Sequence, residues 1–198
     1  MINSENPNKS RLEEYTELAK KSLVKVQYSC GGNSTSIDEP ERIPIVSDQL
    51  KPLNTVLYTQ AREEDVEDIV KLLKDSNLPV KDLGTGKRMF LVALAAEKLI
   101  GVVAVELYDE YGLLRSLAVN NEFRGLNVGK KLVAEAENWS RNNGLKQLYL
   151  LTTTAADFFP KLGWKTTERS SAPESIAAST EFASVCPSSA VCMMRKLE

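Results

Sequence analysis

The amino-acid sequence predicts a mixed α/β fold with a mostly antiparallel sheet flanked by helices. Three observations indicate it: three consecutive β-rich runs lie between residues 89 and 120, amphipathic helical patterns precede and follow them, and further β-rich segments come after the second helix. Short strands joined by tight turns favour antiparallel pairing, and the helices on either side favour a layered α/β architecture.

The first 50 residues differ in composition from the rest of the chain. Leu12, Tyr15, Ala19 and Leu23 recur at helical spacing, and a stretch rich in Gly, Ser and Pro follows them. Little apolar surface is available there to offset the entropy of ordering the chain. We therefore expect an N-terminal extension over residues 1–50, with a short helix and a flexible linker, and one domain over residues 51–198.

The domain begins with a predicted strand at 55–61 and a helix at 63–78. One stripe of that helix holds the apolar residues, acidic residues occupy its first turn, and it ends before Pro79. The stripe consists of Val66, Ile69, Val70, Leu72 and Leu73. The three β-rich runs at 89–120 then predict an antiparallel meander of three strands.

A second amphipathic helix is predicted within 121–144. Val128, Leu132, Ala136 and Trp139 recur every three or four residues, and Gly144 supplies a C-terminal stop. A strand at 145–155, a short helix at 155–163, a short extended segment at 164–169, a Ser/Ala-rich excursion and a last strand at about 190–195 complete the order.

Composition excludes several classes of function. The 198 residues include 25 Lys plus Arg and 27 Asp plus Glu, without the dense basic block that nucleic-acid backbones require. No apolar run approaches the roughly 18 residues of a membrane span. Without histidine, no His-dependent nucleophile system or His-containing zinc site can form, and we expect no metal site. Three cysteines without CxxC spacing, and no signal segment, indicate reduced thiols in a cytoplasmic protein.

The most specific signal lies in SLAVNNEFRGLNVGKKLV, where a strand ends, a loop follows and a helix opens. The loop carries Arg124, Gly125, Asn127 and Gly129. Such a loop turns successive backbone N–H groups toward one point at a helix N-terminus, where the helix dipole favours an anion. The spacing matches neither a GK[ST] loop nor GxGxxG, so we predict a phosphate site of another kind.

The loop resembles the [QR]xxGx[GA] signature of the GNAT-type N-acetyltransferases, present here as RGLNVG at 124–129. The strand LLRSLAV before it, the helix after it and the downstream FFPKLGW, which is similar to the family's YxxxGF element, extend the resemblance over about residues 55–197. Asn127 stands where the family usually has glycine. The resemblance implies the GNAT acyl-CoA N-acyltransferase fold, with acetyl-CoA as the cofactor.

The resemblance also implies where acetyl-CoA would bind. Its pyrophosphate would lie on the amides of the loop and helix start, with Arg124 nearby, and its pantetheine arm would run beside the strand that leads into the loop. The implied cofactor-binding residues are Leu117, Ala118, Val119, Arg124, Gly125, Asn127, Val128, Gly129 and Lys130, with Thr154, Phe158 and Phe159 on the far side.

A smaller set of segments resembles the arsenic-resistance-associated GNAT proteins. These are LLRSLAV, LYLLTTTAADFF, LGW, Arg169, TEF at 180–182 and CPSSAVCM at 186–193. The resemblance implies a detoxifying role in which the amine of a small molecule is acetylated, with an amino-acid-like or organoarsenical toxin as the candidate acceptor.

Glu106 is our candidate for the general base. The ammonium proton of the acceptor must be removed, the chain has no histidine, and a carboxylate at the end of an apolar strand is unexpected unless it has a role. The alternative is a strand-end glutamate that faces solvent. Phe159 occupies the place of the family's usual acid, a tyrosine; Ser188, Cys186 or Tyr111 could substitute, but we prefer water as the proton source.

Acceptor contacts are expected from Arg115, Thr152, Arg169, Glu181 and Cys186. Arg115 is placed on the same strand face as Leu117 and Val119 by period-two alternation, and it either holds a substrate carboxylate or pairs with Glu106. The excursion that carries Glu181 suits either an acceptor lid or an exposed loop. Cys186 is either a buried small apolar residue or a contact to substrate or arsenic.

The sequence therefore predicts a small-molecule N-acetyltransferase that uses acetyl-CoA and has neither nucleic acid nor membrane as a partner. The alternative is a catalytically weak acyl-CoA-binding or metabolite- or arsenic-sensing protein, which Asn127 and Phe159 favour. A protein acetyltransferase is disfavoured because no added recognition domain is visible. A homodimer through the C-terminal strands is an open alternative to a monomer.

Overall fold

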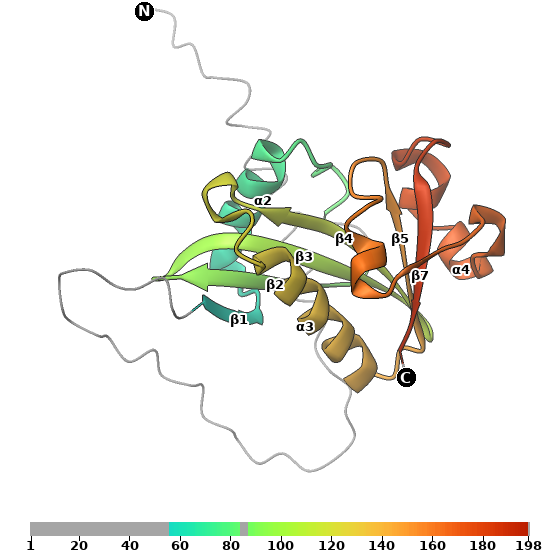
Figure 1. Cartoon of the computed structure of the whole chain (residues 1–198), viewed down its shortest axis with the longest axis horizontal. Coiled ribbons are helices and arrows are strands. Elements are labelled where there is room, and N and C mark those ends of the chain that lie inside the picture. The colour runs from blue at the N-terminus through green and yellow to red at the C-terminus, as the bar shows by residue number, and fades with distance from the viewer. Residues whose placement is uncertain (1–55, 84–86, 198) are drawn as a thin grey trace, which may run out of the picture.

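The computed structural model describes residues 56–83 and 87–197, which form a seven-stranded sheet with helices on both faces (Figure 1). The expected extension over residues 1–50, including its helix and Cys30, lies outside the described residues. The strand order is β1-β2-β3-β4-β5-β7-β6, and the β4–β5 pair is the parallel one in this order. The predicted fold class is therefore confirmed.

The strands and helices follow the predicted order closely. The strands are β1 (Val56–Gln60), β2 (Arg88–Ala95), β3 (Lys98–Tyr108), β4 (Tyr111–Val119), β5 (Gln147–Thr152), β6 (Lys165–Thr166) and β7 (Val191–Lys196), and the α-helices are α2 (Val66–Asp75), α3 (Val128–Asn142) and α4 (Glu174–Ala177). The helix expected at 155–163 is reduced to a 3-10 turn, η3 (Phe159–Leu162), with Pro160 in its first turn and Gly163 at a φ of 85° at its end.

The two long helices cover opposite faces of the sheet. The apolar stripe of α2, which includes Val66, Ile69 and Leu73, packs against Phe90 and Val102 on one face. On the other face, the stripe of α3 packs against Met89, Leu91 and Val103, which alternate with the residues of the first set. The predicted helix stripes and the antiparallel meander are both confirmed.

The sheet separates into two halves between β4 and β5. Only Tyr111, Gly112 and Leu113 of β4 pair with β5, and the remainder of β4 has no partner on that side. In addition, β4 bulges where Val102 pairs with Ala118 but Ala104 pairs with Arg115, and Ser116 in this bulge has a φ of 55°. The two strands therefore separate beyond Leu113.

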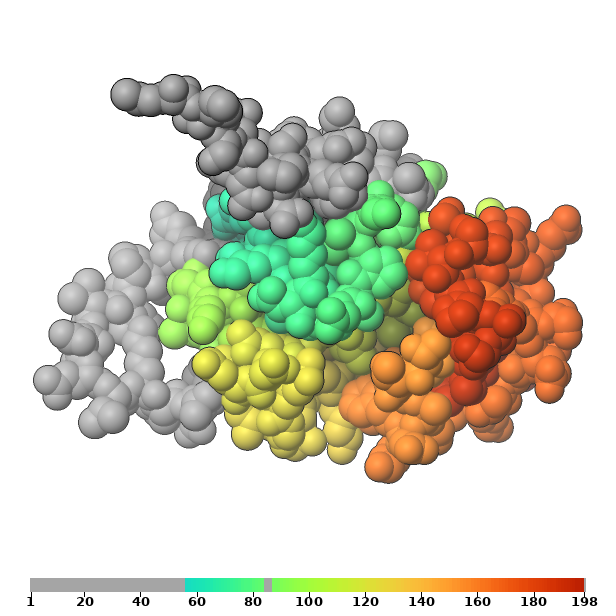
Figure 2. Space-filling view, turned by 90° about the horizontal axis from the view of Figure 1, so that it is seen from above, coloured from blue at the N-terminus to red at the C-terminus, as the bar shows by residue number. Residues whose placement is uncertain are grey.

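The excursion before β7 folds against the sheet as a lid segment, defined here as residues 167–190. It contains α4 and a π-helical turn, η5 (Glu181–Val185). Ile176 and Phe182 of this segment are buried against Leu113 and Tyr149, which places the lid segment on the same sheet face as α2. Figure 2 shows this C-terminal segment in red, beside the teal and green of the α2 region. The excursion is thus packed against the sheet and is not an exposed loop, while its role as an acceptor lid stays a prediction.

None of the helices in the described residues is both long enough and apolar enough to cross a membrane. Within the same residues, no group of three or more His, Cys, Asp or Glu side chains is arranged to hold a metal ion.

Candidate functional site

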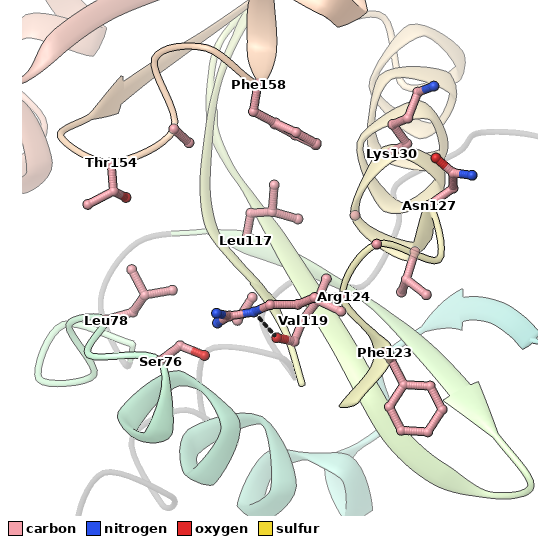
Figure 3. A pocket seen from close by; sticks show the side chains of 15 residues that line it. Ser76, Leu78, Leu117, Val119, Phe123, Arg124, Asn127, Lys130, Thr154 and Phe158 are labelled. Carbon is pink, nitrogen blue, oxygen red and sulfur yellow. Dashed lines mark hydrogen bonds between the residues drawn. The ribbon is translucent and has the colours of Figure 1, made fainter. Parts of the chain in front are cut away.

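Two adjoining cavities occupy the gap between β4 and β5. The larger has a volume of about 510 Å³ and lies between the end of β4 and the start of α3 (Figure 3). The smaller, of about 260 Å³, lies under the lid segment. Both are bordered by Leu78, Leu117, Thr154 and Ala155. We call the larger one the loop pocket and the smaller one the lid pocket.

The loop pocket is built around the start of α3. The first intrahelical bond there runs from the Lys131 N–H to the Asn127 carbonyl, so the preceding amides have no partner within the helix. The Asn127 side chain makes no capping hydrogen bond to them, and its backbone has a φ of 62°. These amides therefore remain available to an anion, which the helix dipole also favours.

The structure explains the two glycines of the loop in different ways. Gly125 has a φ of 79°, which glycine adopts at little cost. Gly129 has no positive φ, and it provides space, because an added Cβ would lie 3.5 Å from Val119 Cγ2 and 3.7 Å from Phe158 Cζ. A side chain there would fill the groove between β4 and Phe158.

The remaining walls of the loop pocket come mainly from β4 and from the turn after β5. Leu117, Ala118, Val119, Arg124, Lys130, Thr154 and Phe158 all border it, as expected. The exposed Arg124 donates from Nε to the Val119 carbonyl at 3.1 Å, which orients its guanidinium along the end of β4 (Figure 3). Phe159 does not border this pocket: it is 4% exposed and packs edge-on against Phe158 and Trp164, so its placement here was wrong.

The lid pocket brings together four of the five predicted acceptor residues. Arg115, Thr152, Glu181 and Cys186 all border it, together with Phe159. The Thr152 hydroxyl accepts hydrogen bonds from the Thr154 and Ala155 amides, which shapes the turn where β5 ends. The strands and the lid segment are thus joined at one cavity by residues far apart in the sequence.

A buried cluster of five charged side chains lies beside this cavity. We call it the ion cluster, and it consists of Asp82, Arg88, Glu106, Arg115 and Glu181. Arg115 Nη2 lies 2.6 Å from Asp82 Oδ2 and 2.7 Å from Glu181 Oε2, and Arg115 Nη1 donates to Glu106 Oε2 at 3.1 Å. Glu181 is the member that the lid segment contributes.

Arg115 faces the opposite side of β4 from the one we expected. The bulge at Ser116 breaks the alternation, so that Leu117 and Val119 pack toward α3 while Arg115 meets Asp82 and Glu106 on the α2 side. Of its two expected roles, the ion pair with Glu106 is confirmed. Burial alone would lower the pKa of Arg115, but attraction to Glu181, Asp82 and Glu106 outweighs it and raises that pKa.

Glu106, our candidate for the base, is buried and held by ion pairs, which disfavours that role. It is 5% exposed and borders neither pocket. Its Oε2 accepts from Arg88 and Arg115, and its Oε1 accepts from the Tyr108 hydroxyl at 2.8 Å. Both oxygens are therefore engaged, and the solvent-facing alternative fails as well. The Tyr108 pKa is raised, mainly by burial and by this hydrogen bond.

Two members of the ion cluster, Arg88 and Asp82, were missed from the sequence. Arg88 is fully buried and pairs in register with Glu106, 18 positions further along the chain. An arginine directly before an apolar strand was the available signal, but its partner depends on strand register. Asp82 lies between α2 and β2, and its backbone carbonyl accepts a hydrogen bond from Arg88 Nη1.

Cys186 touches the ion cluster through Glu181. Its Sγ donates to Glu181 Oε1 at 2.9 Å. Burial, followed by this hydrogen bond and the Glu181 charge, raises the pKa of the Cys186 thiol to about 12. The thiol is therefore protonated at neutral pH, which disfavours a nucleophilic role.

Arg169, which was predicted as an acceptor contact, does not border the lid pocket. Its guanidinium donates to the carbonyls of Phe182, Cys186 and Pro187 and lies 5.3 Å from the Phe182 ring centroid. Arg169 thus holds together the turn that carries Glu181 and Cys186.

Comparison with known proteins gives the class of this fold. Residues 86–166 match the model of the Acetyltransferase (GNAT) domain. An uncharacterised N-acetyltransferase of Chlorobaculum tepidum is 34% identical over 90 residues, which are 45% of this chain. The chain spans 57% of the length of that relative.

Solved structures show the same architecture. N-acetylglutamate synthase from Neisseria gonorrhoeae, complexed with coenzyme A and N-acetyl-glutamate, superposes with a TM-score of 0.62 at 20% identity, covering 73% of this chain and 35% of that one. A Mycobacterium tuberculosis protein in complex with CoA gives a TM-score of 0.62 at 22% identity, covering 72% of this chain and 99% of that one. The described residues therefore have the fold of these GNAT structures, as the resemblance seen in the sequence implied, and residues 86–166 are similar to the GNAT domain.

Proposed function

We propose that this protein is an acetyl-CoA-dependent N-acetyltransferase that acts on the amine of a small molecule. The observation that carries the proposal is the continuity of the loop pocket with the lid pocket through the gap between β4 and β5. An anion-binding helix start at one end and a pocket with a carboxylate at the other match what the two reactants require.

The loop pocket fits the cofactor. The amides at the start of α3 suit a pyrophosphate, and Gly129 leaves open the groove that a longer side chain would close. Leu117, Val119 and Phe158 provide apolar walls for a pantetheine arm. When bound, acetyl-CoA supplies a thioester carbonyl to which an amine nitrogen adds as the thiolate leaves.

The chain's own groups support the reaction in two ways. Ser116 and Leu117 lie at the bulge of β4 and border the lid pocket, so a backbone N–H at this bulge is our candidate to polarise a carbonyl in the gap. Glu181 is the carboxylate that borders the lid pocket and can hold the ammonium proton. Water remains the proton source that we propose for the thiolate, because the Phe159 side chain has no proton to donate.

The arsenic-resistance role is a finer proposal and rests on the sequence resemblance. An organoarsenical or amino-acid-like acceptor would have to fit the lid pocket, where Cys186 and Arg115 are the groups that could meet it. Acceptor trials should therefore include aminoarsenicals beside simple amines and amino acids.

An acyl-CoA-binding sensor with little turnover is the second candidate. Phe159 favours it, because the usual acid of the family is missing at that position. Both the enzyme and the sensor would bind acyl-CoA in the loop pocket, but only the enzyme would release CoA as a free thiol at an appreciable rate.

Calorimetric titration with acetyl-CoA, followed by thiol release with a panel of amines, tests the proposal. Binding with amine-dependent release supports the enzyme, binding without release from any amine favours the sensor, and no binding contradicts both. Arg124→Ala should weaken binding, whereas Arg141→Ala, which removes an exposed arginine at the other end of α3, should not.

A further inference from the structure

We infer that a basic pocket at the C-terminal end of α3 binds a phosphate-bearing anion, at a site separate from the loop pocket and the lid pocket. This basic pocket has a volume of about 440 Å³ and is lined by Arg141, Gly163, Lys165, Met194, Arg195 and Lys196. Four of these residues are cationic and none is acidic. The whole chain has a formal net charge of −2, so the positive charge is concentrated locally.

The basic pocket is remote from the acetyl-CoA site that we propose. Arg141 belongs to the last turn of α3, whereas the loop pocket surrounds the first turn. At about 1.5 Å per residue, the 15 residues of α3 separate its two ends by about 20 Å. The basic pocket shares no lining residue with the loop pocket or with the lid pocket. An anion bound here is therefore a second ligand and not a part of the cofactor.

The pocket lies at the edge of the sheet, where β7 extends beyond β6. The pairing of β6 with β7 covers Met193 and Met194, and Arg195 and Lys196 continue β7 past it. Successive strand residues point to opposite faces, so Arg195 approaches from the α3 side and Lys196 from the other side. Cations from both faces of the sheet thus converge on one hollow.

Arg195 is held in position by the protein itself. Its Nη1 donates to the Gly163 carbonyl at 2.9 Å, and its Nε lies 3.6 Å from Glu137 Oε2. Glu137 is held in turn, since its Oε1 accepts from Trp164 Nε1 at 2.8 Å. The Arg195 side chain is 34% exposed, and its Nη2 makes no hydrogen bond with any described residue. A guanidinium ordered in this way loses little conformational entropy when it binds an anion.

Gly163 makes this position of Arg195 possible. It ends η3 with a φ of 85°, which glycine adopts at little cost. A Cβ at this position would overlap Arg195 Nη1. Gly163→Ala should therefore displace the guanidinium while leaving every charge of the basic pocket in place.

Lys165 and Lys196 add positive charge that no carboxylate of the described residues neutralises. Of the cations Lys165, Arg195 and Lys196, only Arg195 has a carboxylate of that part of the chain within ion-pair distance, that of Glu137. Like charges gathered around a hollow focus the field and attract a counter-ion. A phosphate group suits this set, because its oxygens can accept from a guanidinium and two ammonium groups at once, and its charge is about −1.5 to −2.

Calorimetry on the full chain with inorganic pyrophosphate provides the test. Saturating CoA fills the loop pocket, and about 0.15 M salt screens charges that lie more than roughly 8 Å apart. We expect one additional site per chain, with pyrophosphate bound at least tenfold tighter than citrate. The double variant Lys165→Gln, Lys196→Gln should weaken pyrophosphate at least tenfold, and Gly163→Ala at least threefold. The matched control Lys71→Gln, Lys81→Gln removes two exposed charges outside the basic pocket and should change the affinity less than twofold.

Three results would overturn the inference: no additional site for pyrophosphate, citrate bound as tightly as pyrophosphate, or equal effects of the two double variants. The first two results come from the unmodified chain, so they decide the matter even if a variant misfolds. If the chain binds no CoA, the proposed function fails, but the comparison of the two double variants still assigns the pyrophosphate site.

Discussion

The loop pocket and the lid pocket meet at the same gap but differ in the kind of polar groups that line them. In the loop pocket the polar groups include main-chain amides at the start of α3, with the side chains of Arg124 and Lys130 close by in the same continuous stretch of chain. In the lid pocket they are side chains, and the ion cluster beside it draws on five separate points of the chain. Backbone amides survive most substitutions, whereas a network of buried charges depends on every member.

That difference has a functional meaning. The loop pocket is suited to a ligand that stays the same, since the backbone amides at the start of α3 contribute to its recognition beside side chains such as Arg124. The lid pocket can change its chemistry through single substitutions, at the risk of stability. The predictions below separate the two behaviours.

The largest effect should follow Arg88→Leu. Arg88 is fully buried, and its loss leaves Glu106 with fewer donors inside the protein. We expect the free energy of unfolding to fall by about 3 to 5 kcal/mol, measured by urea denaturation. Arg141→Leu at an exposed position should cost less than about 0.5 kcal/mol. A loss below 1 kcal/mol for Arg88→Leu would mean that the ion cluster is not a coupled unit.

Cys186 should react very slowly with alkylating agents. Because its pKa is raised to about 12 by burial and Glu181, its thiolate fraction at pH 8 should be about a thousandfold below that of an unperturbed cysteine. Iodoacetamide labelling resolved by peptide mass spectrometry measures this, with the urea-unfolded chain as the reference. Glu181→Gln should accelerate labelling, since it removes one cause of the raised pKa; labelling of the folded parent within tenfold of the unfolded rate would contradict the prediction.

Gly129→Ala should separate stability from binding in the loop pocket. Alanine in the first turn of α3 should stabilise the fold by about 0.5 to 1 kcal/mol, because the added Cβ meets its neighbours at ordinary contact distances. The same methyl occupies the groove, so the acetyl-CoA dissociation constant should rise about tenfold. Asn138→Ala on the exposed side of α3 is the control and should leave binding unchanged. Unaltered affinity in Gly129→Ala would move the cofactor away from this groove.

The smallest effect should come from Arg169→Ala. Three carbonyl contacts are lost, and we expect about 1 kcal/mol of destabilisation, with faster hydrogen exchange over residues 180–187. Arg169→Lys keeps the charge but loses the forked geometry, so it should resemble the alanine variant. Acetyl-CoA affinity should stay the same in both; a large change would show that the two pockets are not independent.

Much of the loop pocket could be predicted from the sequence because its determinants are local. Gly125, Asn127 and the start of α3 lie within a few residues, and their dihedral preferences and helix periodicity are properties of the chain itself. The meander between β2 and β4 was predictable for the same reason, since short turns leave few alternative pairings.

The lid pocket was only partly predictable, because it depends on register and on one irregularity. Pairing between Arg88 and Glu106 requires the exact alignment of β2 with β3. Ser116 has a positive φ although it is neither glycine nor asparagine. The sequence therefore did not predict the bulge that turns Arg115 to the α2 side. Arg115, Glu181 and Cys186 were predicted for the acceptor site and do border the lid pocket. The ion pairs of Glu106 with Arg88 and Arg115 depend on tertiary contacts that the sequence does not reveal.

The short ladder between β4 and β5 also bears on how such a protein can diversify. Three residue pairs join the two halves of the sheet there, and everything from the end of β5 to β7, including the lid segment, lies beyond that junction. Exchange of this C-terminal arm between related chains would therefore transplant Glu181 and Cys186 of the lid pocket while leaving the RGLNVG loop untouched. Under the proposed function, acceptor specificity would then be separable by recombination from cofactor binding.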